Sequence, residues 1–329
     1  MKTFRISEYW LYLLFILFYS GNIFPNELIQ SKGEVVTSNA LATEAGEKIL
    51  AEGGNAYDAA TTISAMLSVV EPFASGLGGG AFWLIYDAKS KKYTMLDARE
   101  TAPLQSHKNM YLDENENVIK NMSTLGPLSA GIPGIPAGLG HVNDKYGAKK
   151  LSTLLNPAYR AAINGFPVNE RYLKGANYKK KWLKKYKETE AIFLHKGEVP
   201  KKGWILKQND LARTIKKLMK DGHRSFYTGS FAKKMVESVQ NNGGIWSEED
   251  LNSYKVLERE PVRSTYKGIS IIAPGLPSSG GLVLSNALNI LAGYELDKLS
   301  PTTQKHLIIE SLRRAYYERA LKMGDPDFM

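Results

Sequence analysis

The stretch SGLGGGAFWLIYD, residues 75–87, decides the fold, together with LDARETAP at residues 96–103. The glycines lead into a strand-like run at 82–86, and a polar turn joins this run to a second one at 93–96. The pattern predicts a β-hairpin whose second strand ends on an Arg-Glu pair.

Arg99 is the candidate binding residue of this hairpin, because it stands where the second strand ends. A guanidinium can hold a carboxylate through two parallel hydrogen bonds, which lysine cannot reproduce. From spacing alone, an ion pair with Glu100 or Asp97 that fixes the strand end is the favoured interpretation.

The glycines at 76–80 do not predict a dinucleotide site. That motif needs a strand before the glycines and a helix after them, with phosphate at the helix N-terminus. Here a helical pattern comes before and a strand pattern after. We therefore expect a tight turn with positive φ at one or more positions, lying beside a site rather than contacting ligand.

Composition indicates an ordinary globular protein with a sizeable core. The chain has 329 residues, 43% hydrophobic and 23% charged, and no linker rich in Pro, Gly and Ser divides it. The absence of cysteine excludes disulfides and thiolate metal sites. The five histidines lack metal-ligand spacing, and no Gly-x-Ser-x-Gly elbow is present. We therefore expect no metal site, and we do not expect the chain to be an α/β-hydrolase.

The net charge of +10 is partly local, because residues 174–187 contain seven lysines. No nucleic-acid motif accompanies the run, so it predicts a solvated face rather than a binding surface, and no nucleic-acid partner.

The first segment has the pattern of a targeting signal. Lys2 and Arg5 precede an uncharged apolar run at 9–19, which is shorter than the roughly 18–20 residues that span a bilayer. We expect residues 1–22 to be a signal peptide or an uncleaved amino-terminal anchor. The expected location is periplasmic or secreted, with membrane anchoring as the alternative.

The remaining patterns alternate between strand and helix and predict a mixed α/β fold. A short strand is expected at 35–38, an ordered loop at 126–140 and a strand at 266–273. Helices are expected from a Thr43 cap to Gly53, from Asn55 or Asp58 to Glu71, from the SSGG at 278–281 to about 293, from Thr302 or Thr303 to Ala320, and over 151–164, 208–220 and 231–241. The serines of the SSGG are expected to form an N-cap rather than an anion site.

Further motifs show a family resemblance. They are EGGNAYDAA at 52–60, AGIPG at 130–134, GG at 243–244, YKG at 266–268, PGLPSSGG at 274–281 and GDPDF at 324–328. With the hairpin block, they make the chain from about Val36 to Met329 resemble the large-subunit half of a gamma-glutamyltransferase, also called gamma-glutamyltranspeptidase or glutathione hydrolase. The resemblance implies an amino-terminal nucleophile hydrolase fold, a four-layer αββα sandwich of the α/β (α+β) class. It would be incomplete here, because the small subunit is missing.

The resemblance also implies a mechanism. One precursor cuts itself into two subunits, and the new N-terminal threonine of the small subunit is the nucleophile, with its own α-amino group as base. A gamma-glutamyl group passes from glutathione or a conjugate to that threonine, then to water, an amino acid or a peptide. Arg99 would bind the α-carboxylate of the gamma-glutamyl group.

No catalytic residue and no cofactor site are expected in this chain. The family's nucleophile begins a strand, whereas Thr302 and Thr303 begin a helix. We expect residues 33–329 to be the large-subunit region, truncated before the autocleavage site, inactive alone and partnered by the small subunit.

Two alternatives remain open. A related cephalosporin acylase or poly-gamma-glutamate depolymerase would keep the fold and change the substrate. A non-catalytic protein would keep Arg99 as a clamp for a glutamyl carboxylate.

Overall fold

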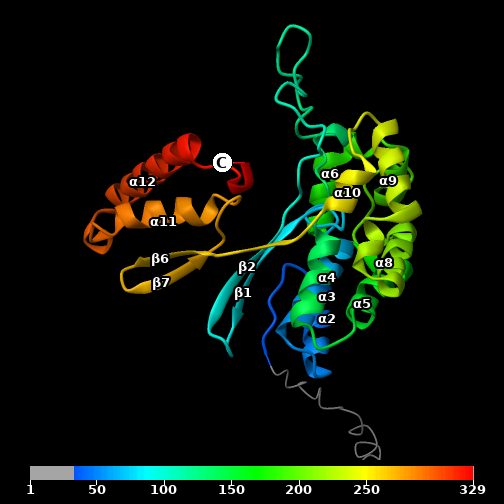
Figure 1. Ribbon diagram of the computed structural model, residues 1–329, viewed down its shortest axis with the longest axis horizontal. Coiled ribbons are helices and arrows are strands. Elements are labelled where there is room, and N and C mark those ends of the chain that lie inside the picture. The colour runs from blue at the N-terminus through cyan, green and yellow to red at the C-terminus, as the bar shows by residue number, and fades with distance from the viewer. Residues whose placement is uncertain (1–32, 329) are drawn as a thin grey trace, which may run out of the picture.

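The computed structural model describes residues 33–328, and the expected signal segment at 1–22 lies outside them. A helical body, a sheet and a second helical lobe follow one another in space (Figure 1). The body consists of α2 (Ala40–Ala51), α3 (Ala56–Val70), α4 (Ile135–Tyr146), α5 (Leu151–Asn164), α6 (Glu170–Leu183), α7 (Lys187–Phe193), α8 (Asn209–Asp221), α9 (Gly229–Asn241) and α10 (Glu248–Ser253).

A three-stranded antiparallel sheet connects the body to the lobe. Its order is β1 (Ala81–Asp87), β2 (Lys92–Ala98) and β5 (Leu257–Arg259). The register pairs Ala81 with Ala98 at one end of the hairpin, and Leu96 with Glu258 across the second pair of strands. The predicted hairpin is therefore confirmed.

The lobe is built on the hairpin of β6 (Val262–Tyr266) and β7 (Ile269–Ala273), against which α11 (Gly280–Leu291) packs. The long helix α12 (Pro301–Lys322) packs on α11. The backbone N–H of Gly275 donates to Met95 Sδ at 3.2 Å, which ties the entry of α11 to β2. None of the helices within residues 33–328 has the length and apolar character that crossing a membrane needs.

Minor elements complete the body. Strands β3 (Phe166–Pro167) and β4 (Ile205–Leu206) pair antiparallel. Single-turn 3₁₀ helices occur at Pro127–Ser129, His223–Phe226, Leu296–Lys298 and Pro326–Phe328.

The core lies where α3 packs against α2, α4 and α5. Small side chains along α3, such as the buried Ala59 and Ala65, let these helices approach closely. Asp58 forms a capping box with Asn55 and also accepts from the backbone N–H of Ala148 at 3.0 Å. This buried carboxylate therefore joins the start of α3 to the chain just after α4.

Two helix starts differ from the prediction. Helix α2 begins at Ala40 and is capped by Asn39, whose side chain accepts from Leu41 N–H, rather than by Thr43. Helix α12 is capped by Ser300, because Pro301 can occupy the first helical position without an N–H of its own.

Three further predictions are corrected. Residues 35–38 form no strand. Residues 135–140 belong to α4 rather than to a loop. Their glycines serve close packing of this helix, since Gly138 packs on Trp83 and Ala98 and Gly140 packs on His223. The single strand expected at 266–273 is the end of one strand and the whole of the next, since Lys267 and Gly268 turn with positive φ.

Candidate functional site

A cavity of about 570 Å³ lies where the end of β2 meets the lobe and the last described residues. Its lining combines three motifs that are far apart in the sequence. Arg99 and Glu100 follow β2, Ser278 and Ser279 precede α11, and Asp325 belongs to the GDPDF motif.

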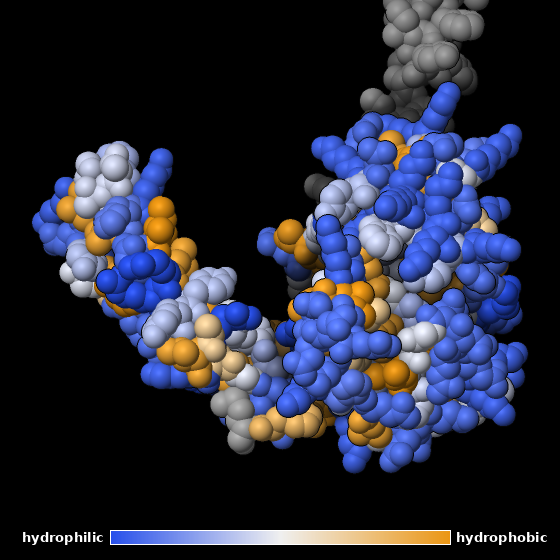
Figure 2. Space-filling model, turned by 90° about the horizontal axis from the view of Figure 1, so that it is seen from above, coloured by the Kyte–Doolittle hydropathy of each residue, from blue (hydrophilic) through white to orange (hydrophobic). Residues whose placement is uncertain are grey.

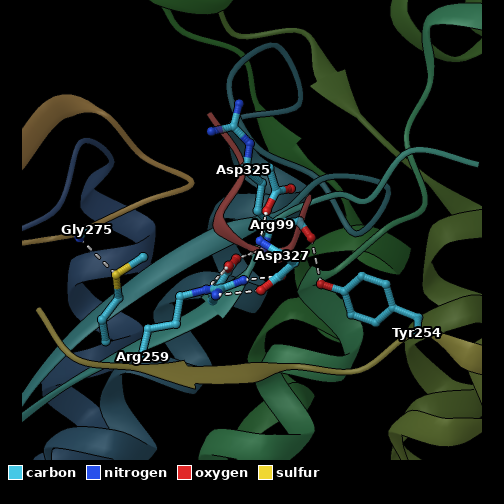
Figure 3. Close-up of polar contacts among 8 residues, drawn as sticks. Arg99, Tyr254, Arg259, Gly275, Asp325 and Asp327 are labelled. Atoms are coloured by element: carbon cyan, nitrogen blue, oxygen red, sulfur yellow. Dashed lines mark hydrogen bonds and ion pairs between the residues drawn. The ribbon is translucent and has the colours of Figure 1, made fainter. Parts of the chain in front are cut away.

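Arg99 is held by its backbone and leaves its side chain exposed. Its N–H donates to Asp97 Oδ1 at 3.1 Å, and its carbonyl oxygen accepts from the Tyr254 hydroxyl at 2.8 Å (Figure 3). Within the described residues, the guanidinium makes no hydrogen bond or ion pair with protein. The ion pair with Asp97 or Glu100 that spacing favours is therefore not formed, and the guanidinium can accept a ligand carboxylate.

The reason is that Asp97 has another partner, Arg259. Arg259 Nε donates to Asp97 Oδ2 at 2.8 Å, and its two terminal nitrogens donate to the Asp327 carboxylate at 3.0 and 2.5 Å. These hydrogen bonds hold the pKa of the Asp327 carboxyl below its usual range and raise the pKa of Arg259. Sequence reasoning missed Arg259, because nothing local indicates a partner 162 positions away.

Two tyrosines support the backbone at Arg99. The rings of Tyr254 and Tyr227 stack with centroids 5.5 Å apart and planes 7° apart. Tyr227 donates its hydroxyl proton to Pro133 O at 2.8 Å and accepts from Ala137 N–H at 3.1 Å. Burial raises the pKa of both tyrosines, so both keep their hydroxyl protons and act as donors at neutral pH.

The glycine-rich turn lies beside Arg99, as expected, but its glycines do not supply the positive φ angles that the sequence predicts. Positive φ occurs at none of the glycines at 76–80. A Cβ on Gly80 would lie 2.6 Å from Glu100 N, and Gly79 O accepts from Gly134 N–H at 2.9 Å. Of these glycines, Gly80 is therefore the one needed for close approach to the backbone that carries the Arg-Glu pair.

The predicted serine cap of α11 is not formed. Ser279 precedes the helix without making a side-chain cap bond, and its Oγ accepts from Arg319 Nε at 2.8 Å. This contact instead connects the start of α11 to α12 at the edge of the cavity.

Comparison with known proteins identifies the family. A family model described as Gamma-glutamyltranspeptidase matches residues 42–329. The chain is similar to the Glutathione hydrolase proenzyme of Pseudomonas sp. (strain A14), with 40% identity over 300 residues that cover 90% of this chain and 52% of that protein. The chain thus spans about half the length of the curated relatives it matches.

Solved structures agree with this result. The chain resembles the crystal structure of Helicobacter pylori gamma-glutamyltranspeptidase with a TM-score of 0.87 and 39% identity, covering 90% of this chain and 86% of that chain. It resembles the Pseudomonas nitroreducens gamma-glutamyltranspeptidase complexed with L-DON with a TM-score of 0.84 and 33% identity, covering 90% and 88%. The expected α+β fold of the amino-terminal nucleophile hydrolases is thereby confirmed. The chain belongs to the gamma-glutamyltranspeptidase family.

Proposed function

We propose that this chain is the large-subunit part of a gamma-glutamyltransferase and that Arg99 binds the α-carboxylate of the gamma-glutamyl donor. The observation that carries the proposal is the exposed guanidinium of Arg99, which lines a polar cavity and has no protein partner in the region from 33 to 328. Family membership supplies the reaction class, and a glutathione-type donor supplies a carboxylate of the right charge.

In the proposed reaction this chain positions the donor, and the small subunit does the chemistry. The threonine hydroxyl adds to the γ-carbonyl while the threonine's α-amino group takes its proton. The amide C–N bond then breaks, and the departing amine receives the proton. Water or an amino acid next attacks the glutamyl ester, which restores the threonine. Arg99 contributes by fixing the far end of the glutamyl group, which orients its carbonyl.

The proposed partner is a small subunit cut from the same precursor. Figure 2 shows orange, hydrophobic surface on the lobe and a hollow between the lobe and the helical body. Large apolar side chains on α12 and β7 are exposed, among them Ile269 at 66%, Ile309 at 62%, Tyr317 at 64% and Leu321 at 63%. Faces of this kind mark interaction surfaces. We propose that the small subunit covers them, and we expect the chain produced alone to self-associate.

The proposed location is outside the cytoplasm, in the periplasm or secreted. It rests on the charged start and the apolar run at 9–19. Fractionation of producing cells tests it, and recovery of the protein from the cytoplasm alone would contradict it.

The role of Arg99 is tested in a precursor that contains the small subunit. We expect Arg99→Ala to raise KM and to lower kcat/KM for glutathione by about 10- to 100-fold, the effect of a lost charged hydrogen-bond pair. Arg160→Ala removes an exposed arginine from α5 and serves as the matched control.

Two donors separate carboxylate binding from a general defect. A 4-aminobutyryl amide lacks the α-carboxylate, so Arg99→Ala should leave its kcat/KM unchanged. An equal loss with both donors would show that Arg99 acts structurally.

A glutaryl amide used better than glutathione would favour an acylase. Calorimetric binding of glutathione without turnover would favour a binding protein.

A further inference from the structure

A second arginine without an acidic partner lines the cavity that holds Arg99. This residue, Arg319, belongs to α12 of the lobe, whereas Arg99 follows β2. The two arginines therefore reach the cavity of about 570 Å³ from different elements. That volume lies within the range of sites that enclose small molecules. The cavity thus offers separate cations to the two ends of one ligand.

The guanidinium of Arg319 is anchored at one nitrogen and free at the other two. Its Nε donates to Ser279 Oγ at 2.8 Å, and its central carbon lies 5.9 Å from the ring centroid of Tyr316. Among residues 33–328, its terminal nitrogens make no hydrogen bond and no carboxylate pairs with it. A guanidinium held in this way still presents two neighbouring donors, the arrangement that binds a carboxylate through two hydrogen bonds.

The other cations of the cavity are less suited to this task. Arg259 is already bonded to the carboxylates of Asp97 and Asp327. Lys255 lines the cavity and forms no ion pair with any residue that the structure describes, but its ammonium is a point charge on a flexible stem. Arg319 is therefore the group that can hold a second carboxylate in a fixed direction.

We propose that Arg319 binds the carboxylate at the leaving-group end of the donor, so that the favoured donors are gamma-glutamyl peptides with a free C-terminal carboxylate. This inference rests on the proposed function, in which Arg99 binds the α-carboxylate of the same donor. Glutathione carries one carboxylate at each end, which matches two arginines on different elements. A donor with a neutral leaving group would use Arg99 alone and would bind more weakly.

The competing interpretation makes Arg319 a structural tie between α11 and α12. Its hydrogen bond to Ser279 fits that role. A tie of this kind uses one N–H of the guanidinium, however, and gives no task to the terminal nitrogens at the cavity. The two interpretations differ in what they predict for different donors, because a structural tie affects every donor equally.

The test compares glutathione with its C-terminal amide, which lacks only the second carboxylate. Hydrolysis is measured without an acceptor, in the enzyme formed from a precursor that contains the small subunit. We expect Arg319→Gln to lower kcat/KM for glutathione about 10-fold through KM and to leave kcat nearly unchanged, because the contact is made equally in the ground state and the transition state. Both constants for the amide should stay as they are in the unsubstituted enzyme.

Three further variants separate carboxylate binding from damage to the lobe. Arg319→Lys keeps the charge without the paired donors and should recover part of the loss. Arg313→Gln removes an exposed arginine of the same helix that does not line the cavity, and should leave both donors unchanged. Ser279→Ala deletes the anchor of Arg319 and should weaken glutathione alone, several-fold. It decides the question where Arg319→Gln fails to mature.

Several outcomes would overturn the proposal. Equal losses with glutathione and its amide would leave Arg319 as a structural tie. A selective loss in Lys255→Gln but not in Arg319→Gln would assign the contact to the lysine, and an effect confined to the KM of an amino-acid acceptor would assign it to the acceptor.

The proposed function is tested separately. Arg99→Ala should keep the preference for glutathione over its amide, because the two arginines hold different carboxylates. If Arg99→Ala changed nothing, the role proposed for Arg99 would fail, whereas the amide comparison at Arg319 would still be decided by its own result.

Discussion

At the residue scale, the position of Arg99 depends on bonds made by its neighbours. Tyr254 fixes the carbonyl oxygen of Arg99, and Asp97 fixes its N–H. Arg259 occupies the carboxylate that would otherwise attract the Arg99 guanidinium. The arginine proposed to bind substrate is therefore kept available by another arginine.

Removing one hydroxyl tests this support. Tyr254→Phe keeps the ring stacked on Tyr227 and deletes the bond to Arg99 O. We expect a loss of about 1 kcal/mol in the free energy of unfolding, and a rise in KM for glutathione in the complete enzyme because Arg99 is less well placed. Tyr178→Phe, at an exposed hydroxyl, is the control for chemical denaturation and kinetics. Unchanged stability and KM in Tyr254→Phe would contradict a positioning role.

At the element scale, backbones in close contact place β2 beside the start of α4. A Cβ on Gly134 would lie 2.0 Å from Ala98 O and 2.3 Å from the Tyr254 hydroxyl oxygen. A Cβ on Gly138 would lie 2.4 Å from the Trp83 ring. Glycine is required here by the closeness of a neighbouring strand, since neither position has positive φ.

Two alanine substitutions test whether a glycine matters because of its close contacts or only because it is a glycine. Gly134→Ala should destabilise the chain by about 1–3 kcal/mol, because one of the two clashes is with backbone, which cannot rotate away. Gly78→Ala, in the glycine-rich turn, meets nothing within 4 Å and should change stability by less than about 0.5 kcal/mol. Thermal unfolding of both variants measures the difference. Equal destabilisation would show that the close contact of Gly134 with Ala98 is not the reason why glycine is needed there.

At the scale of the whole molecule, charged contacts join segments that are far apart in the chain. Arg259 connects β2 to the GDPDF motif, and Glu258 on the same strand accepts hydrogen bonds from His141 and Lys145 of α4. The short strand β5 is thereby held on both sides just before the lobe begins. The placement of the cavity depends on these contacts.

The Arg259–Asp327 contact should depend on pH. The pKa of Asp327 is lowered in the folded protein, so its stabilising effect is complete above the unfolded pKa of about 4 and is lost as pH falls through the folded pKa. We expect the amide hydrogens of Asp327 and Phe328 to exchange faster as the pH is lowered below about 4, after correction for intrinsic rates.

The variant Arg259→Gln should show this faster exchange already at neutral pH. Arg213→Gln, at an exposed arginine of α8, is the control and should leave the exchange of the Asp327 and Phe328 amides unchanged. Protection that stays the same in Arg259→Gln would show that the GDPDF motif is held by other contacts.

The amino-acid sequence by itself determined the elements that depend on local pattern. The hairpin of β1 and β2, helices α3, α5, α8, α9 and α11, and the place of Arg99 at a strand end all follow from hydrophobic period, caps and breakers. The motif order also indicated the family, because each motif is a contiguous stretch that can be recognised without its neighbours.

Only the tertiary structure decided which distant groups meet. The pairing of Asp97 with Arg259, the hydroxyl of Tyr254 on Arg99 and the close approach of Gly80 to Glu100 join residues through packing, and no local signal encodes them. The same holds for Arg319, whose place in a helix is visible in the sequence while its contact with Ser279 forms only when α11 and α12 pack together. Local propensity acts over a few residues, whereas a site is assembled by contacts between segments that the chain brings back together.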